Sequence, residues 1–420
     1  MSNPERYDIA VVGAGAAGLM AAVWAGRAGA RVVALDGART LGAKILVAGG
    51  GRCNVTHHAV DESAYAGSSR HAIKKVLRAF DVGRTLGFFA ELGVELKREE
   101  TGKLFPVTDE ARTVLNALLR AVREARAELR HPWRVGAVRR ETDGFVVVRE
   151  AAEESITAER VIVATGGMAL PRSGSDGFGY QILRSLGHTT TERIFPALVP
   201  ITLDPGRTFI PSLSGLTVPA TITLWSGTGR KLVEFTNSTL CTHFGLSGPG
   251  VLDISRYWLD TRATDPGATL TINWLPGRTE ADVDAELAAP RAVGIGRELG
   301  GRLPDRLARA LCESCGIDPS GTLDRLRRDD RRRLVSALTR SPLPVTGDRG
   351  FTCAEATAGG VPLSELHLES MASRVCPGLH LCGEVCDVDG RIGGFNFQWA
   401  WSSGYVAGKG AAERLNRANG

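Results

Sequence analysis

The stretch YDIAVVGAGAAGLMAAVWAGRAGARVVALD, residues 7–36, decides the fold of this chain. An apolar run of strand length leads into a glycine-rich turn, a helix of small residues follows, and a second apolar run ends on an acidic residue. This order is the βαβ pattern that binds dinucleotides, in which the acid stands about 20 residues beyond the glycines. The stretch therefore predicts a Rossmann-like α/β unit.

Each motif residue has a physical role in this interpretation. Gly13 allows the tight turn, Gly15 lets the backbone approach a pyrophosphate, and Gly18 lets the helix pack closely on the strand. Free N–H groups and the positive end of the helix dipole then attract the phosphates. Asp36 can accept hydrogen bonds from the hydroxyls of an adenosine ribose. The motif does not distinguish NAD from FAD.

The composition is that of an ordinary globular protein of two or three domains. The chain has 420 residues, of which 43% are hydrophobic and 23% charged, and a net charge of +5. We expect no membrane span, because the apolar run 9–35 contains glycines, Arg27 and Arg31, and no signal peptide precedes it. Eight scattered cysteines favour reduced thiols, and we predict a cytoplasmic protein.

Three further glycine-rich segments favour a flavin. Gly49–Gly51 leave backbone N–H groups for an anion or a flat ring, and Lys44 and Arg52 add cations. The strand 160–165 runs into Gly166–Gly167, a mark of two-dinucleotide flavin folds, after a predicted hairpin over 133–141 and 144–150. Gly393–Gly394 precede a helix from near residue 396 to about 412, whose positive end suits the pyrimidine edge of a flavin.

The middle of the chain predicts two inserted domains. Helical periodicity covers 72–92 and 108–129, and prolines then punctuate short alternating runs from residue 195 onward. We predict a FAD-binding domain over 1–195 and 345–420, an antiparallel β-barrel domain over 196–276, and a helical domain over 277–344. The helical domain contains six arginines between Arg325 and Arg333, interleaved with aspartates, which favours a solvated helix face over a nucleic-acid contact.

The motifs support a family resemblance. The matching stretches are GAGAAG (13–18), AGGGRCN (48–54), VIVATGG (161–167), FPALVPI (195–201), THFGLSGP (242–249), ATAGGV (356–361) and GEVCDVDGRIGGFNFQWAWSSG (383–404). With these, the chain resembles the BaiN/YhiN-like FAD-dependent oxidoreductases, which include aminoacetone-oxidase-like flavoproteins. It departs from them at Ala48, where the family usually has Ser, and over 175–179.

The resemblance implies a two-dinucleotide (Rossmann-like) FAD-binding domain of α/β class, built from both ends of the chain, with the β-barrel and helical domains inserted. It also implies where FAD is bound. Together with the motif positions, it places the cofactor at Gly13, Gly15, Ala16, Gly18, Asp36, Lys44, Gly51, Arg52, Cys53, Asn54, Val135, Thr165, Gly166, Gly383, Glu384, Asp387, Gly394, Asn396 and Phe397. We predict no metal site.

The predicted function is hydride transfer at flavin N5 to or from a small-molecule substrate, with the helix that begins near Gly394 stabilising charge on the flavin. No second G-x-G-x-x-G unit accompanies the first, so either NAD(P)H visits the flavin transiently or O2 accepts its electrons. His243 is the candidate proton donor or acceptor, with a structural histidine as the alternative. Nucleic acid and membrane are not expected partners, and the oligomeric state is not predicted.

Two other functions compete with this one. The arginine-rich run supports a flavoprotein that binds or modifies RNA, and the first motif alone is compatible with a plain NAD-binding module.

Overall fold

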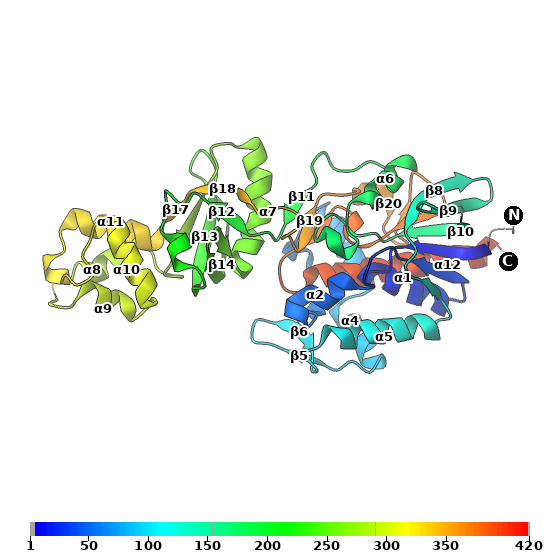
Figure 1. Cartoon of the computed structure of the whole chain (residues 1–420), viewed down its shortest axis with the longest axis horizontal. Coiled ribbons are helices and arrows are strands. Elements are labelled where there is room, and N and C mark those ends of the chain that lie inside the picture. Colours follow the sequence, from blue (N-terminus) through cyan, green and yellow to red (C-terminus); the bar gives the residue numbers. More distant parts are fainter. Residues whose placement is uncertain (1–4, 153, 290, 419–420) are drawn as a thin grey trace. The chain divides into compact units, whose positions relative to one another are not determined.

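The computed structural model of the protein describes residues 5–152, 154–289 and 291–418. The chain forms two compact units: unit 1 comprises residues 1–196 and 354–420, and unit 2 comprises residues 197–353 (Figure 1). Because unit 1 takes in both ends of the chain, its fold depends on contacts between segments far apart in the sequence.

The central sheet of unit 1 is the predicted Rossmann-like sheet. Strand β1 (Glu5–Val12) lies between β2 (Val32–Leu35) and β10 (Ser155–Val163) and is parallel to both. The sheet continues through β7 (Glu128–Arg130) on one side and through β22 (Leu379–Leu381), β21 (Ala372–Ser373) and β20 (Leu366–His367) on the other. The predicted hairpin is confirmed as β8 (Val135–Glu141) and β9 (Gly144–Arg149), joined to β10.

Two helices from opposite ends of the chain pack against each other beside this sheet. Helix α1 (Ala16–Arg27) follows β1, and α12 (Phe395–Ala418) is the last helix of the chain (Figure 1, blue and red). A Cβ atom at Gly404 would lie 2.5 Å from the carbonyl oxygen of Ala17, and one at Gly408 would lie 2.3 Å from that of Ala21. The helices therefore approach so closely that only glycine fits at these two positions of α12.

The remaining elements of unit 1 surround the sheet and differ from the sequence prediction in two places. The helical pattern over 72–92 forms two helices, because the carboxylate of Asp81 accepts a bond from the Arg84 amide and starts a new helix there. The pattern over 108–129 ends as a helix at Glu124, and its last residues belong to β7. The helices are α2 (Ala43–Gly51), α3 (Arg70–Ala79), α4 (Val82–Glu91), α5 (Ala111–Glu124) and α6 (Phe178–Ser185).

Short strands and single 3-10 turns connect these elements. The strands are β3 (Thr56–His57), β4 (Tyr65–Gly67), β5 (Leu96–Arg98), β6 (Lys103–Pro106), β11 (Phe195–Ala197), β19 (Ala356–Ala358) and β23 (Val388–Gly390). The single 3-10 turns are η1 (Glu62–Ala64), η2 (Pro171–Ser173), η5 (Leu363–Glu365) and η6 (Gly383–Val385).

Unit 2 contains an antiparallel sheet in place of the predicted barrel. Its seven strands run in the order β17-β16-β13-β14-β15-β12-β18, which is an open path with β17 and β18 at its edges. Helix α7 (Pro249–Thr264) packs on β13 and β14. The strands are β12 (Ile201–Leu203), β13 (Thr217–Trp225), β14 (Lys231–Thr242), β15 (Gly245–Ser247), β16 (Thr269–Asn273), β17 (Ser341–Leu343) and β18 (Val345–Asp348).

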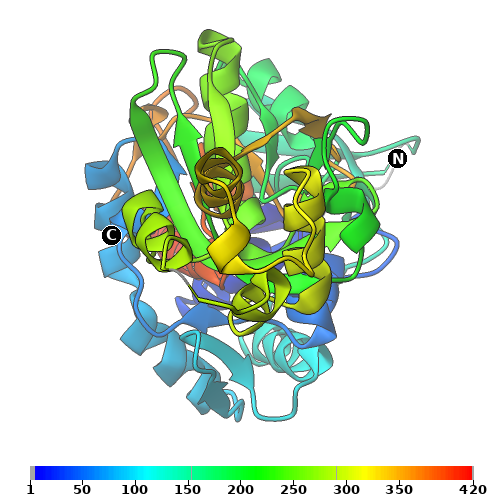
Figure 2. The same cartoon turned by 90° about the vertical axis from the view of Figure 1, so that its left-hand side faces the viewer.

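A helical group completes unit 2 and shares one hydrophobic core with the sheet. It consists of α8 (Glu280–Leu287), α9 (Ile295–Gly300), η4 (Leu323–Arg325), α10 (Asp305–Ser314) and α11 (Arg328–Thr339), with η3 (Ile210–Leu213) near the sheet (Figures 1 and 2, yellow). The predicted boundary at residue 345 falls inside this unit, because β18 pairs with β12. Among the described helices, none is long and apolar enough to cross a membrane.

The glycines of α12 provide a test of the α1–α12 contact. We expect Gly408→Ala to destabilise the protein by about 1–3 kcal/mol, because the new methyl group overpacks the contact with Ala21. Gly87→Ala is the matched control in α4, where a Cβ atom would have no neighbour within 4 Å, and it should stabilise by about 0.5–1 kcal/mol. Urea unfolding of both variants measures the difference, and equal effects of the two changes would contradict the contact.

A polar network around the buried His188 joins the segment after α6 to η5 and β21. His188 Nδ1 lies 2.6 Å from Glu365 Oε2, and Ser373 Oγ lies 2.8 Å from His188 Nε2. Burial opposes ionisation of Glu365, but hydrogen bonds from Thr189 and His188 outweigh it and hold the pKa of the carboxyl below its ordinary value of 4.5. Ser373 Oγ also accepts hydrogen bonds from the backbone amides of Val375 and Cys376. The network is therefore structural.

The lowered pKa gives this network a defined pH dependence. The folded state favours the ionised Glu365, so its contribution is complete above the unfolded pKa of about 4.5 and is lost as the pH falls through the folded value. We expect Glu365→Gln to cost about 1.5–3 kcal/mol of unfolding free energy at pH 7. Its difference from the wild type should shrink below pH 4, and a difference that stays constant down to pH 3 would contradict the assignment.

Candidate functional site

The first glycine turn leaves an open space in front of α1. Gly13 has φ of +94°, and a Cβ atom at Gly18 would lie 1.9 Å from the Gly13 carbonyl oxygen, which explains both glycines. Gly15 is the N-cap of α1 and has no side-chain cap, and a Cβ atom there would meet nothing within 4 Å. The amide groups of Gly15 and Ala16 at this helix end can therefore bind an anion.

Asp36 lies directly after β2 with its carboxylate fixed by the backbone. Its Oδ2 accepts the amide of Ala14 at 2.7 Å, and its Oδ1 accepts the amide of Ala38 at 2.8 Å. The residue is 9% exposed. Each oxygen retains a lone pair, so the carboxylate is held in place and can still accept a ligand hydroxyl.

The second glycine segment lies at the end of α2, where the backbone leaves the helical conformation. Gly49, Gly50 and Gly51 all have positive φ, and a Cβ atom at Gly50 would meet nothing within 4 Å. The guanidinium of Arg52 is paired with Glu99 at 2.7 Å and lies 4.0 Å from the centre of the Phe105 ring. The backbone of this segment is therefore open, whereas the Arg52 side chain is engaged within the fold.

Cys53 and Asn54 follow this segment and are both buried. Cys53 adopts φ of +62°, and burial raises the pKa of its thiol to about 12, so the thiol stays protonated at neutral pH. Asn54 is 8% exposed, and its Oδ1 has no hydrogen-bond partner among the described residues. A buried amide oxygen without a donor is costly, which indicates that a ligand donor is missing.

The segment after β10 and the start of α6 show the same feature. The Thr165 hydroxyl is buried and has no partner in the described part of the chain, and a Cβ atom at Gly179 would lie 1.9 Å from it. The hydroxyl of Tyr180 is buried and equally unsatisfied. Burial, with Glu384 nearby, raises the pKa of Tyr180, which therefore stays a phenol. Gly166 turns the chain beneath this cluster with φ of +74°.

An ion pair joins the two ends of the chain at this site. Lys44 Nζ is paired with Glu384 Oε2, and Glu384 Oε1 accepts the Thr357 amide at 2.8 Å. The Thr357 hydroxyl in turn accepts the amides of Met168 and Ala169. The network therefore brings together α2, the segment after β10, β19 and η6. Gly383 begins η6 against α1, where its Cβ atom would lie 2.8 Å from that of Ala17.

The N-terminus of α12 rests on β3. A Cβ atom at Gly394 would lie 2.6 Å from the backbone of Thr56, so only glycine permits this contact. The Asn396 side chain bonds both the amide and the carbonyl of Gly390, and Phe397 stacks on Trp401 with ring centres 5.5 Å apart. These two side chains are thus held in place by the fold.

Of the three remaining predicted residues, two lie in unit 1 and one lies in unit 2. Asp387 is 8% exposed and accepts the Ser68 hydroxyl at 3.1 Å, and Val135 is the buried first residue of β8. His243 lies in unit 2, exposed in the turn between β14 and β15 with Phe244 edge-on at 5.1 Å. All of the predicted cofactor-binding residues thus lie in unit 1, whereas His243 belongs to unit 2. Among the described residues, no group of three or more acids, histidines or cysteines is placed to hold a metal ion.

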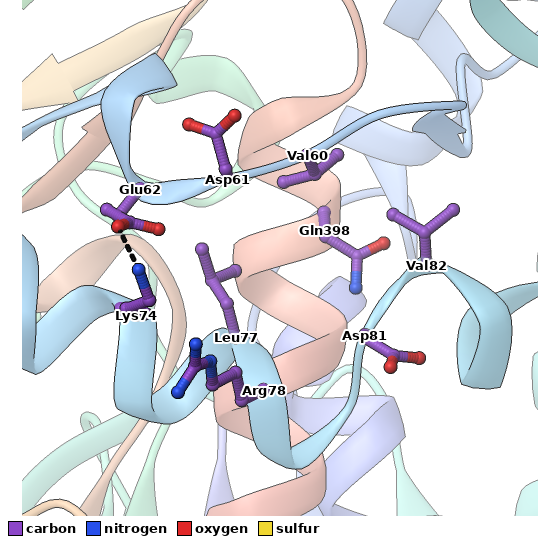
Figure 3. Close-up of a pocket in the computed structure, with 9 residues that line it drawn as sticks. All are labelled: Val60, Asp61, Glu62, Lys74, Leu77, Arg78, Asp81, Val82 and Gln398. Atoms are coloured by element: carbon purple, nitrogen blue, oxygen red, sulfur yellow. Dashed lines mark hydrogen bonds and ion pairs between the residues drawn. The ribbon is translucent and has the colours of Figure 1, made fainter.

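A pocket of about 270 Å³ lies on unit 1 between α3, α4 and α12 (Figure 3). Its polar groups serve the fold: Asp61 and Asp81 cap helices, Glu62 pairs with Lys74, and the Gln398 amide bonds neighbouring hydroxyl and carbonyl groups. The pocket is lined by Val60, Asp61, Glu62, Lys74, Leu77, Arg78, Asp81, Val82 and Gln398. It contains none of the predicted cofactor-binding residues.

Comparison with known proteins identifies the family of this chain. The family described as HI0933-like protein Rossmann domain matches residues 7–410. The chain belongs to this family. It is therefore an FAD-dependent oxidoreductase, and the resemblance predicted from the motifs is confirmed.

Two curated relatives match over almost their whole length. The "Ribosomal RNA dihydrouridine synthase" of Escherichia coli is 35% identical over 96% of this chain and 97% of its own length. The "3-dehydro-bile acid delta(4,6)-reductase" of Clostridium scindens is 34% identical over 97% and 99%. The solved 3-ketosteroid delta1-dehydrogenase of Sterolibacterium denitrificans, 13% identical with a TM-score of 0.52, covers 98% of this chain and all of its own and shares the fold.

The residues of unit 1 fit an FAD molecule. The space before Gly15 suits a pyrophosphate, and the unsatisfied Asn54 Oδ1 and Thr165 hydroxyl supply polar groups that a bound cofactor would satisfy. Sequence reasoning missed Thr357 and Tyr180. The ATAGGV motif, which contains Thr357, was visible, but its hydrogen bonds to the segment after β10 had no sequence signal.

The Lys44–Glu384 pair is open to a direct test. Both side chains are about a quarter exposed or less, so we expect a double-mutant cycle of Lys44→Met and Glu384→Gln to give a coupling of about 1–2 kcal/mol. The pair Lys231–Glu234, about half exposed, is the control and should give no more than about 0.5 kcal/mol. Urea unfolding of the FAD-free proteins provides both values, and additive effects at Lys44 and Glu384 would show that the pair does not form.

Proposed function

We propose that the protein is an FAD-dependent reductase that saturates a carbon–carbon double bond conjugated to a carbonyl group. The observation that supports this proposal is the chemistry shared by the names of its two full-length relatives. A 3-dehydro-delta(4,6) steroid and the uracil ring of uridine both contain a double bond conjugated to a carbonyl. Saturation of either needs two electrons and two protons, so one flavin site can serve both substrates.

Bound FAD supplies the two-electron chemistry through hydride transfer at N5. The residues of this chain would hold and polarise it. We assign the pyrophosphate to the N-terminus of α1 at Gly13, Gly15, Ala16 and Gly18, and the adenosine ribose to Asp36. The Lys44–Glu384 pair, Asn54 and Thr165 would lie along the cofactor, and the N-terminus of α12 near Gly394 would stabilise the negative charge of the reduced ring.

The electron donor in this proposal is NAD(P)H, which visits the flavin transiently, and O2 as acceptor is the alternative. Cys53 takes no part in disulfide chemistry, because its thiol is buried with a raised pKa. The proton donor or acceptor in this proposal is His243, which is exposed in unit 2.

A second candidate function is the reduction of a uridine base in RNA. The name of the Escherichia coli relative supports it, since dihydrouridine forms by saturation of a uridine base in the polymer. The prediction that the protein has no nucleic-acid partner stands against it.

Anaerobic reduction of the purified holoenzyme tests the reaction type. We expect NADH or NADPH to bleach the flavin absorbance within seconds, and a conjugated enone or an unmodified ribosomal RNA transcript to restore it under nitrogen. An isolated alkene is the control and should leave the reduced protein unchanged. Mass spectrometry of the product should show a gain of two hydrogens. Reoxidation by O2 alone, with no response to either unsaturated substrate, would identify an oxidase instead.

A further inference from the structure

The arginine-rich run of the sequence forms part of an exposed surface on unit 2. Its residues belong to η4 and to the first two turns of α11, in the helical group that faces the viewer in Figure 2. Residues 324–333 contain six arginines and three aspartates. The contacts of these side chains separate the arginines into two classes.

The first class consists of arginines that are paired with carboxylates inside the helical group. These pairs are Arg278 and Arg302 with Glu286, Arg291 with Glu298, Arg331 with Asp284, and Arg333 with Asp330. Such arginines have a structural explanation, because each pair links two elements or two turns of one helix.

The second class consists of Arg325, Arg327, Arg328 and Arg332. All four are exposed, and within the described part of the chain no carboxylate oxygen lies within 4.0 Å of their guanidinium groups. We call these four residues the arginine surface. Its nearest acids are largely committed elsewhere, since Asp284 bonds Arg331 and Asp330 bonds Arg333. The surface therefore retains a local excess of positive charge, with Asp324 and Asp329 as its exposed acids.

Helix stability does not account for these four residues. Arg327 is the N-cap of α11 and Arg328 its first residue, where the positive end of the helix dipole disfavours a cation. Arg328 and Arg332 stand four residues apart on one side of the helix and repel each other. Because the four residues are also exposed, they gain no stability from burial, and their charges are available to a ligand.

We propose that the arginine surface binds the phosphate backbone of a structured RNA. This inference rests on the second candidate function, in which uridine in RNA is the substrate. Guanidinium groups form forked hydrogen bonds with phosphate oxygens, and a polymer presents enough phosphates to engage all four residues at once. A small anion would engage one or two of them. The surface would thus add affinity and orientation for RNA without a contact to the reacting base.

Binding of an unmodified ribosomal RNA transcript to the oxidised holoenzyme tests this proposal. Fluorescence anisotropy, repeated over a series of KCl concentrations, gives both the affinity and its salt dependence. We expect the triple variant Arg325→Gln, Arg328→Gln and Arg332→Gln to weaken binding about 10- to 100-fold. It should also reduce the slope of log affinity against log salt by about 2, since each lost phosphate contact contributes about 0.7–0.9.

The control removes the same number of charges from the paired class. Arg291→Gln, Arg302→Gln and Arg333→Gln should leave the affinity within about threefold of the wild type, because these arginines already have carboxylate partners. Equal losses in the two variants, absence of RNA binding by the wild type at low salt, or preferential binding to vesicles of anionic phospholipid would overturn the proposal.

The same proteins separate this proposal from the proposed reaction. If the wild type binds RNA through these arginines but reduces no conjugated double bond, the proposed reaction is wrong and the proposed RNA-binding role of the arginine surface is retained. If the arginine variant and the wild type reduce the RNA transcript at the same rate at subsaturating RNA, the proposed role of the arginine surface is wrong and the proposed reaction is retained. Reduction of a free enone by the variant confirms that its flavin site is intact.

Discussion

The close contact between α1 and α12 is the constraint on which unit 1 depends. The two helices come from opposite ends of the chain, and the glycines at 404 and 408 allow the backbone of one to touch the backbone of the other. Without that approach, the segment 383–397 would not lie against the first βαβ unit. The proposed flavin site, which combines two remote segments, thus depends on the absence of two side chains.

The polar groups of unit 1 follow from this packing. Asp36 is fixed by two backbone amides, and Lys44, Glu384 and Thr357 form a chain of contacts across four segments. In contrast to these satisfied groups, the Asn54 oxygen and the Thr165 hydroxyl have no hydrogen-bond partner among the described residues. In a buried site such groups are costly, and a bound FAD is the simplest source of their partners.

The parts of the fold that sequence predicted are those in which glycine spacing has a local mechanical cause. The turn at Gly13–Gly18, the strand before Gly166 and the helix after Gly394 were all predicted from the residues themselves. The break at Asp81 was missed because a cap overrides a continuous apolar period. The pairing of β18 with β12, which extends unit 2 beyond residue 345, and the Glu384–Thr357 contact depend on tertiary structure and have no local signal.

The central claim is that unit 1 forms one FAD site around the N-terminus of α1, and the flavin content of Gly15→Val tests it most directly. A Cβ atom at Gly15 would meet no other atom within 4 Å, so we expect the variant to fold as the wild type does while its side chain occupies the space for the pyrophosphate. We predict one FAD per chain in the purified wild type and little or none in a folded Gly15→Val. A colourless wild type, or a variant that retains one FAD per chain, would contradict the account.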